Sequence, residues 1–222
     1  MLAAELIDPM LPALKPTDTV GQALEWMQEH RIGQLVMTDL GEYRGIISED
    51  LLLDVPDEDR PLSDVMQLHE LVHALEGQHL FELLRLVVDN HLDVLAVVGE
   101  GNEFLGTISA TELLRQFSQD LGVQEVGAVV VLSLDERDYS MAEISRLVES
   151  NNVKIISSYF SSSTPGSADR STLTLKLNRQ EVVSVISTLE RFGYQIDGIF
   201  ASAPIENIDQ ERLDSLLRYL NT

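Results

Sequence analysis

A strand-to-helix turn that occurs twice constrains this chain more than any other feature. Residues 45–51 read GIISEDL, and residues 106–113 read GTISATEL. Both copies place a glycine at the start, a serine three positions later and an acidic residue in the helix that follows. The chain therefore contains an internal repeat of roughly sixty residues, and such a repeat decides the architecture before any single motif does.

The same pattern of helix and strand precedes both turns. Apolar residues at positions i, i+3, i+4 and i+7 begin at Val20 and again at Leu80, which predicts an amphipathic helix in each copy. Apolar runs at 35–37 and 94–98 come next and are typical of buried strands. A polar turn then leads into the glycine-containing strand and a further helix.

This ordered set resembles the cystathionine-β-synthase-type (CBS) domain, present as a tandem pair. Asp8-Pro9-Met10 and Asp64-Val65-Met66 open the two copies. The resemblance covers roughly residues 1–118, with the first repeat expected at 1–60 and the second at 61–120. It implies two packed copies with a cleft on each side of a pseudo-twofold axis. Such clefts commonly bind adenosine-containing molecules, and such modules commonly dimerise.

A different pattern begins after a short joint at 118–125. Apolar runs predict strands at 126–134, 153–159, 171–177 and 194–201, and amphipathic helices follow the capping box Ser140-x-x-Glu143 and Asn178. The order βαββαβ is typical of a ferredoxin-like sandwich. Residues 125–203 resemble an ACT domain, a regulatory fold that often binds amino acids and pairs its sheets between chains. The fold class expected for the whole chain is therefore mixed α/β and α+β.

Two features modify this second expectation. Amino-acid sites of ACT domains usually have a glycine in the turn from the first strand to the first helix, but residues 135–139 contain none. Dimerisation is then the better role for the domain. The tail at 204–222 has leucines with helical spacing, which predicts a terminal helix that docks on its own chain or on a partner; these are Leu213, Leu216, Leu217 and Leu220.

The CBS resemblance places ligand contacts on the two turns, at Gly45, Ile47, Ser48 and Asp50 and at Gly106, Ile108, Ser109 and Glu112. In the family, the serine or threonine and an acid three residues later contact adenosine. Asp50 follows Ser48 by only two residues, whereas Glu112 has the right offset from Ser109 and one extra methylene. A second interpretation needs no ligand, because Ser109-x-x-Glu112 is a complete capping box and Ser48 can cap its own helix.

The charges near these turns favour some ligands over others. Glu49 and Asp50 would lie near any phosphate at the first turn, and few basic residues are expected close to either turn: Arg31, Arg44, Arg85, His91 and Arg115. Adenosine, AMP or a cationic compound such as S-adenosylmethionine is therefore favoured over a polyphosphate. No cofactor is certain from the sequence.

Composition excludes several classes of protein. The 222 residues carry a net charge of −22 and no cysteine, which opposes binding to nucleic acid and to anionic membranes and excludes disulfides. The sequence starts without a basic stretch and has no apolar run long enough for a membrane span, so a cytoplasmic location is expected. The charge serves either general solubility or function in a salty cytoplasm.

No arrangement of catalytic residues is visible, since nucleophile elbows and phosphate-binding glycine loops are absent from the sequence. His69 and His73 are spaced i, i+4 and would share a helical face, but solvated histidines are favoured over a zinc site; no metal is expected. The sequence therefore indicates a non-catalytic regulatory homodimer, with a regulated protein as a further partner. The alternative is a structural oligomerisation module with vestigial ligand sites.

Overall fold

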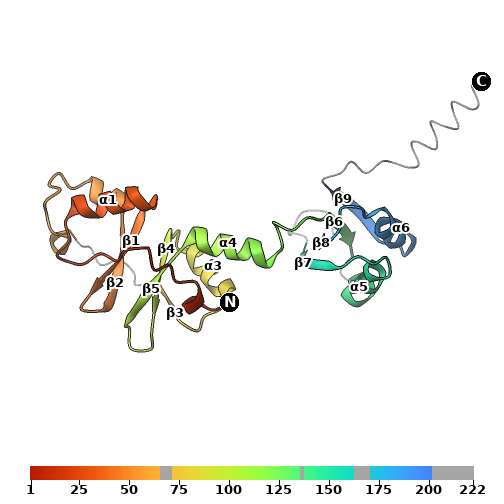
Figure 1. The fold of residues 1–222 in the computed structure, drawn as a ribbon, viewed down its shortest axis with the longest axis horizontal. Helices are drawn as coiled ribbons and strands as arrows, with labels where there is room; N and C mark the ends of the chain where they lie inside the picture. The colour runs from red at the N-terminus through yellow and green to blue at the C-terminus, as the bar shows by residue number, and fades with distance from the viewer. Residues whose placement is uncertain (66–71, 136–137, 163–170, 202–222) are drawn as a thin grey trace, which may run out of the picture. The chain divides into compact units, whose positions relative to one another are not determined.

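A computed structural model describes residues 1–65, 72–135, 138–162 and 171–201. The chain divides into two compact units, Met1–Phe117 and Ser118–Thr222, each with its own core (Figure 1). The helix predicted within 204–222 lies outside the described residues. In the described part of the chain, no helix has both the length and the apolar character needed to cross a bilayer.

The first unit contains two copies of one α/β pattern, as the repeat predicts. Helix, hairpin and second helix follow one another in each copy. The first copy consists of α1 (Val20–His30), β1 (Gln34–Asp39), β2 (Glu42–Ser48) and α2 (Glu49–Leu53). The second consists of β3 (His73–Leu75), α3 (Leu80–Asp89), β4 (Val94–Val98), β5 (Phe104–Ser109) and α4 (Ala110–Asp120). The helices predicted from Val20 and Leu80 are both confirmed.

The two copies also share strand pairing. β1 pairs antiparallel with β2, and β4 pairs antiparallel with β5. In the second copy, β3 lies parallel to β4. The first copy has only a single parallel bridge at the equivalent place, between Leu14 and Met37. One sheet therefore has two full strands and the other has three.

Each copy receives its leading segment from the chain that precedes the other copy. The short helix η1 (Ala3–Glu5) precedes the first copy, yet Ala3 and Leu6 are buried in the core of the second. The short helix η2 (Leu62–Asp64) precedes the second copy, yet Leu62 is buried in the core of the first. The exchange ties the two repeats together, because neither core is complete without residues from the other side.

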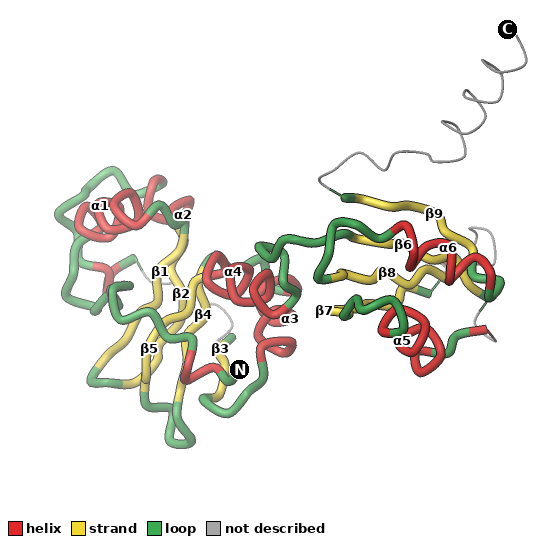
Figure 2. Tube along the Cα trace, turned by 45° about the vertical axis from the view of Figure 1, so that its right-hand side comes forward, coloured by secondary structure: helices red, strands yellow, loops and turns green. Residues whose placement is uncertain are grey.

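A buried apolar seam joins the two copies. It contains Val36 and Tyr43 from the first hairpin and Val94, Ala96 and Val98 from β4. β1 and β4 lie next to each other at its centre (Figure 2). These strands are apolar on both faces because one face packs on the helices of its own copy and the other faces the seam.

The second unit has the predicted element order βαββαβ. Its elements are β6 (Val129–Leu134), α5 (Met141–Glu149), β7 (Ile155–Ser161), β8 (Ser171–Leu177), α6 (Val183–Arg191) and β9 (Gln195–Phe200). All neighbouring strands are antiparallel, in the sheet order β7-β8-β6-β9. Alternate residues of the two central strands pack with both helices in one core, for example Val130 and Leu175 with Ile144 and Val185. Both helices therefore cover the same face of the sheet.

Candidate functional site

The glycine at the start of each turn follows a β-bulge. Met37 pairs with Gly45 and Thr38 with Tyr43, so the residue between them is unpaired, and the second hairpin repeats this irregularity at Gly106. Gly45 has φ = 142°, a conformation that residues with a side chain avoid. A Cβ at Gly106 would collide with Cγ2 of Ile7 in the leading segment. Backbone conformation at Gly45 and close packing at Gly106 therefore each require a glycine, whether or not the turn binds a ligand.

The two isoleucines of the predicted site point into the protein cores. Ile47 and Ile108 are buried, each in the core of its own copy. Only their backbone is left for contact with a ligand. The side chains left for polar contact are therefore those of Asp50, which is exposed, and of Ser48, Ser109 and Glu112, which are half-buried.

At the second turn, Ser109 begins α4 as predicted. Its Oγ accepts a hydrogen bond of 3.1 Å from the amide of Glu112. The Glu112 carboxylate does not complete the capping box but binds the guanidinium of Arg115, with 2.7 Å from Nε. This hydrogen bond lowers the pKa of Glu112 below its ordinary value. The carboxylate is thus ionised and its acceptor atoms are engaged by a neighbouring side chain.

At the first turn, the expectation that Ser48 caps its helix by its side chain is wrong. Ser48 occupies the N-cap position of α2, but its side chain makes no capping bond. The first amide of the helix, that of Glu49, donates instead to the carbonyl of Gly33 at 2.8 Å. α2 is only five residues long, so it leaves little helix for a cap to stabilise. Asp50 is exposed.

A chain of hydrogen bonds connects the starts of α2 and α4. The amide of Gly33 donates to Oδ2 of Asp93 at 2.9 Å, and the carbonyl of Asp93 accepts from the amide of Ala110 at 2.8 Å. Gly33 therefore links the Glu49 amide on one side to Asp93 on the other. Gln34 adds a contact by accepting from the Asp93 amide at 2.8 Å. The two candidate turns are thus bridged by the residues that precede β1 and β4.

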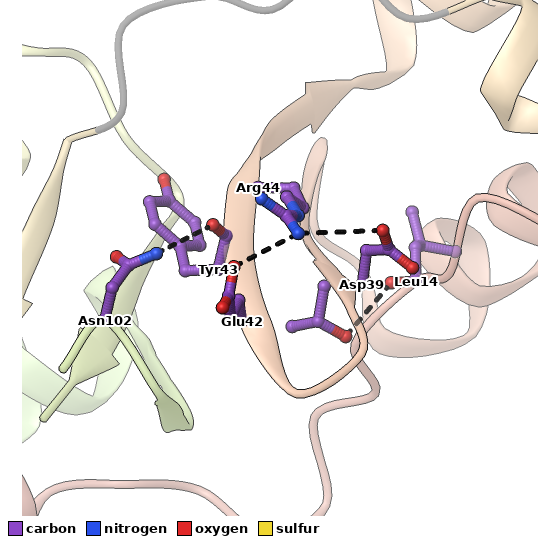
Figure 3. A network of polar contacts seen from close by, with 7 residues as sticks. Leu14, Asp39, Glu42, Tyr43, Arg44 and Asn102 are labelled. Atoms are coloured by element: carbon purple, nitrogen blue, oxygen red, sulfur yellow. Dashed lines mark hydrogen bonds and ion pairs between the residues drawn. The ribbon is translucent and has the colours of Figure 1, made fainter.

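The tips of the two hairpins also meet. Asn102 donates from its side-chain amide to the carbonyl of Tyr43 at 3.4 Å, and Phe104 donates to the carbonyl of Gly41 at 2.9 Å. Figure 3 shows Asn102 pointing toward Tyr43, and Arg44 between Asp39 and Glu42. The Tyr43 hydroxyl donates to the carbonyl of Val72 at 2.8 Å, and burial raises the pKa of Tyr43 to about 12.

The basic residues predicted near the turns are partly neutralised. Arg44 forms ion pairs with Asp39 and Glu42, at 3.7 and 3.1 Å. Arg115 pairs with Glu112. Arg31 lines a cavity of ≈ 710 Å³ beside α1 and α2, where Glu25, Glu49 and Glu58 also lie. The field around the first turn is therefore acidic, as its sequence indicates.

Two other predictions concern residues away from the turns. The prediction that His73 shares a helical face with His69 is wrong for His73, because this residue begins strand β3 and its ring packs edge-on against Tyr43. His69 lies outside the described residues. Among the residues that the structure describes, no cluster of three or more metal-binding side chains occurs.

A residue that the sequence reasoning did not select is Thr107. Its side chain is 1% exposed, and its Oγ1 has no hydrogen-bond partner in the described part of the protein. The sequence signal that could have identified Thr107 is its polarity, because the first copy has the apolar Ile46 at the equivalent position. Buried hydroxyls are nearly always hydrogen-bonded, so each exception needs an explanation.

Two packed copies of an α/β unit, with equivalent glycine turns on either side of a shared seam, define a tandem-repeat module. A family model described as the CBS domain matches residues 3–58 and again residues 62–119. The chain therefore belongs to the CBS domain family.

Individual proteins are similar over about half of the chain. Inosine-5'-monophosphate dehydrogenase from Methanocaldococcus jannaschii is 28% identical over 115 residues, which make up 51% of this chain and 23% of that protein. This chain thus matches less than a quarter of that relative. A CBS domain pair/ACT domain protein from Thermotoga maritima is 22% identical, with a TM-score of 0.49, over 55% of this chain and 99% of the other.

Two further solved structures are that of CBSX2 in complex with AMP and that of the CBS-pair protein CBSX2 from Arabidopsis thaliana. That complex is 20% identical to this chain, with a TM-score of 0.46, and the match covers 53% of this chain and 96% of the other.

Proposed function

We propose that this protein is a non-catalytic regulator whose CBS pair binds an adenosine-type molecule and whose second unit relays the bound state. Membership of the CBS family supports a regulatory module. The observation that carries the proposal is the second turn, where Ser109 and Glu112 stand at the start of α4 with the spacing that adenosine contacts need.

The second turn is the better ligand site of the two. A carboxylate can accept hydrogen bonds from both hydroxyls of a ribose, and Glu112 is ionised. Its present partner, Arg115, is exposed and lies on the same helix, and an exposed ion pair contributes little to stability. A ribose that displaces Arg115 from the Glu112 carboxylate would therefore cost the protein little stability. At the first turn, Asp50 has the wrong offset and Ser48 is next to two acids.

The charge distribution favours a ligand with few phosphates. Arg44 and Arg115 are already paired with carboxylates, and Glu49, Asp50 and Glu58 surround the first turn or the cavity next to it. A polyphosphate would need unpaired cations to offset this field. Adenosine, AMP or a cationic adenosyl compound meets less repulsion.

The second unit is proposed to be a ferredoxin-like, ACT-like domain that pairs with the same unit of a second chain and transmits the ligand-bound state. Its order of elements and its sheet order support this class. The turn from β6 to α5 lines a cavity of ≈ 520 Å³ with Asp135, Asp138 and Glu143. These carboxylates repel the carboxylate of an amino acid, so amino-acid binding is not part of the proposal for this turn.

Homodimerisation is supported by exposed apolar side chains on the second repeat. Phe81 and Val88 on α3 are 65% and 66% exposed, and Leu114 on α4 is 61% exposed. Phe81 and Val88 are seven residues apart and therefore lie on one face of α3, and exposed apolar side chains on one helix face are typical of a protein interface. A second copy of this chain that covers α3 and α4 would place the two ligand-binding modules in one assembly.

The alternative function is a purely structural assembly module. One observation favours it: Ser109 and Glu112 both have partners within α4. Under this alternative, the turns serve only to begin helices and the exchanged leading segments and apolar faces are the functional features.

Ligand-dependent thermal stability separates the two functions, because a molecule that binds only the native state raises the melting temperature by mass action. The full chain would be melted with adenosine, AMP, S-adenosylmethionine and ATP at equal concentrations. The proposal expects a concentration-dependent rise with one of the first three that exceeds the rise with ATP. No rise with any of the four compounds would favour the alternative, a structural assembly module. The largest rise with ATP would refute the ranking of ligands.

A further inference from the structure

An enclosed hydroxyl makes the second turn different from the first. In the first copy, Val36 pairs across the hairpin with Ile46. At the equivalent place in the second copy, Ala96 pairs with Thr107. The second copy has thus lost apolar volume at both positions and gained one hydroxyl group.

The register of the strands gives the direction of this hydroxyl. Residues opposite each other in an antiparallel pair lie on the same face of the sheet, and Ala96 belongs to the seam between the repeats. The Thr107 side chain therefore faces the seam. Ile108, the next residue along β5, points the other way into the core of the second copy.

The same alternation places Thr107 and Ser109 on one face of β5. Side chains two residues apart on a strand share a face and are separated by about 7 Å. Ser109 begins α4 at the candidate ligand turn. A small molecule held at Ser109 and Glu112 is long enough to reach Thr107 along the strand.

The leading segment covers this part of β5. The amide of Asp8 donates to the Thr107 carbonyl at 2.9 Å, and the Ile7 side chain contacts Gly106 so closely that a Cβ there would not fit. Thr107 is 1% exposed, and its hydroxyl is enclosed on the other face of β5, in the seam between the repeats. A ligand therefore reaches the hydroxyl only if the side chains of the seam next to Thr107 move aside.

We propose that Thr107 is the residue that determines base specificity at the second turn, with its hydroxyl binding the polar edge of a purine base. This inference rests on the proposed function. A purine has apolar faces that suit the residues of the seam and an edge with both donors and acceptors, and a threonine hydroxyl can donate and accept. Ile46 offers no such bond at the first turn, so each chain binds one nucleoside.

The test compares Thr107→Val with Thr38→Val in the full-length chain. Valine has nearly the shape of threonine without its hydroxyl. Thr38 is a matched control because it is also buried, at 8% exposed, but its Oγ1 donates to the Leu14 carbonyl at 3.4 Å. Melting temperature without ligand and the dissociation constant for adenosine, by calorimetry, are measured for both variants and the original chain.

Thr107→Val is expected to melt at the same temperature as the original chain or higher, because it removes a buried group that has no partner. It is expected to bind adenosine roughly tenfold more weakly, since one hydrogen bond is lost. Thr38→Val is expected to show the opposite pattern, with a lower melting temperature and an unchanged dissociation constant.

Two results would overturn the inference while leaving the proposed function intact: equal binding of adenosine by Thr107→Val and the original chain, or a drop in the melting temperature of Thr107→Val as large as that of Thr38→Val. If the original chain binds none of adenosine, AMP and S-adenosylmethionine, the proposed function and this inference both fail. Purine riboside lacks the exocyclic amino group of adenosine and so tests whether the Thr107 hydroxyl binds the edge of the base that carries this group. We expect purine riboside to bind more weakly than adenosine to the original chain.

Discussion

At the scale of single residues, the glycine of each turn has a conformational or steric role that the repeat alone does not reveal. Gly45 adopts φ = 142° next to the bulge of the first hairpin. Gly106 allows the leading segment to approach β5 closely. The same residue type thus serves backbone geometry in one copy and close packing in the other.

Gly45→Ala is expected to destabilise the protein by about 1–3 kcal/mol, because alanine is strained at this φ. Urea denaturation measures the change. Gly77→Ala is the control, since a methyl group added at Gly77 would have no atom within 4 Å and the residue has no left-handed φ; its effect is expected within about 0.5 kcal/mol. Equal stability of Gly45→Ala and the original chain would contradict the strain at Gly45.

Two of the five tyrosines are expected to ionise late. Burial raises the pKa of Tyr43 to about 12, and burial followed by the hydrogen bond to Glu143 raises that of Tyr194 to about 12. The unfolded chain releases these protons near the ordinary pKa of 10, so stability falls as the pH rises from about 10 toward 12. Below pH 10 neither tyrosine changes stability with pH.

An alkaline titration of tyrosinate absorbance checks this expectation. Tyr43→Phe and Tyr194→Phe should each remove one late-ionising component and leave the others in place. A titration in which all tyrosines ionise together near pH 10 while the protein is still folded would show that both hydroxyls are accessible.

At the scale of the elements, the leading segments hold the repeats together. Leu6 packs in the core of the second copy and Leu62 in the core of the first. Leu6→Ala and Leu62→Ala are each expected to cost about 2–5 kcal/mol. Hydrogen exchange followed by mass spectrometry should show the loss of protection in α3 for Leu6→Ala and in α1 for Leu62→Ala. The reverse assignment would mean that each segment packs on its own copy.

Local patterns were sufficient to predict most of the elements. The spacing from Val20 and Leu80 predicted α1 and α3, and the apolar runs predicted β1 and β4, because burial on one side imposes a period on the sequence. The element order of the second unit followed in the same way. The exchange of leading segments was not predictable, since pairing between distant segments leaves no periodic trace.

The candidate site was less predictable than the fold. Ser109 caps its helix as its motif indicates, but Glu112 binds Arg115 and Ser48 makes no side-chain cap. A partner three residues away, Arg115, and a partner before β1, Gly33, decide these contacts, and a short motif does not contain them. Thr107 was missed because a threonine in a strand is ordinary until its burial and its missing partner are known.

At the scale of the whole molecule, the net charge of −22 is the dominant property. Ion pairs form at Arg44, Arg115 and Arg146, but 37 acidic residues face only 15 lysines and arginines, so most carboxylates have no cation to pair with and repel one another. Salt shortens the range of this repulsion from about 10 Å at 0.1 M to about 3 Å at 1 M. Adaptation to a salty cytoplasm predicts a strong dependence of stability on salt.

The melting temperature of the full chain is expected to climb steadily as KCl rises from low to molar concentration. A melting temperature that stays flat in KCl would contradict adaptation through charge screening and leave solubility as the role of the charge.

The central claim is that one adenosine-type molecule binds each chain at the second turn. Isothermal titration of the full-length protein with adenosine, AMP, S-adenosylmethionine and ATP tests it most directly. We predict saturable binding of one of the first three with one molecule per chain and weaker binding of ATP. Two equivalent molecules per chain, tightest binding of ATP, or no heat with any of the four would contradict the account.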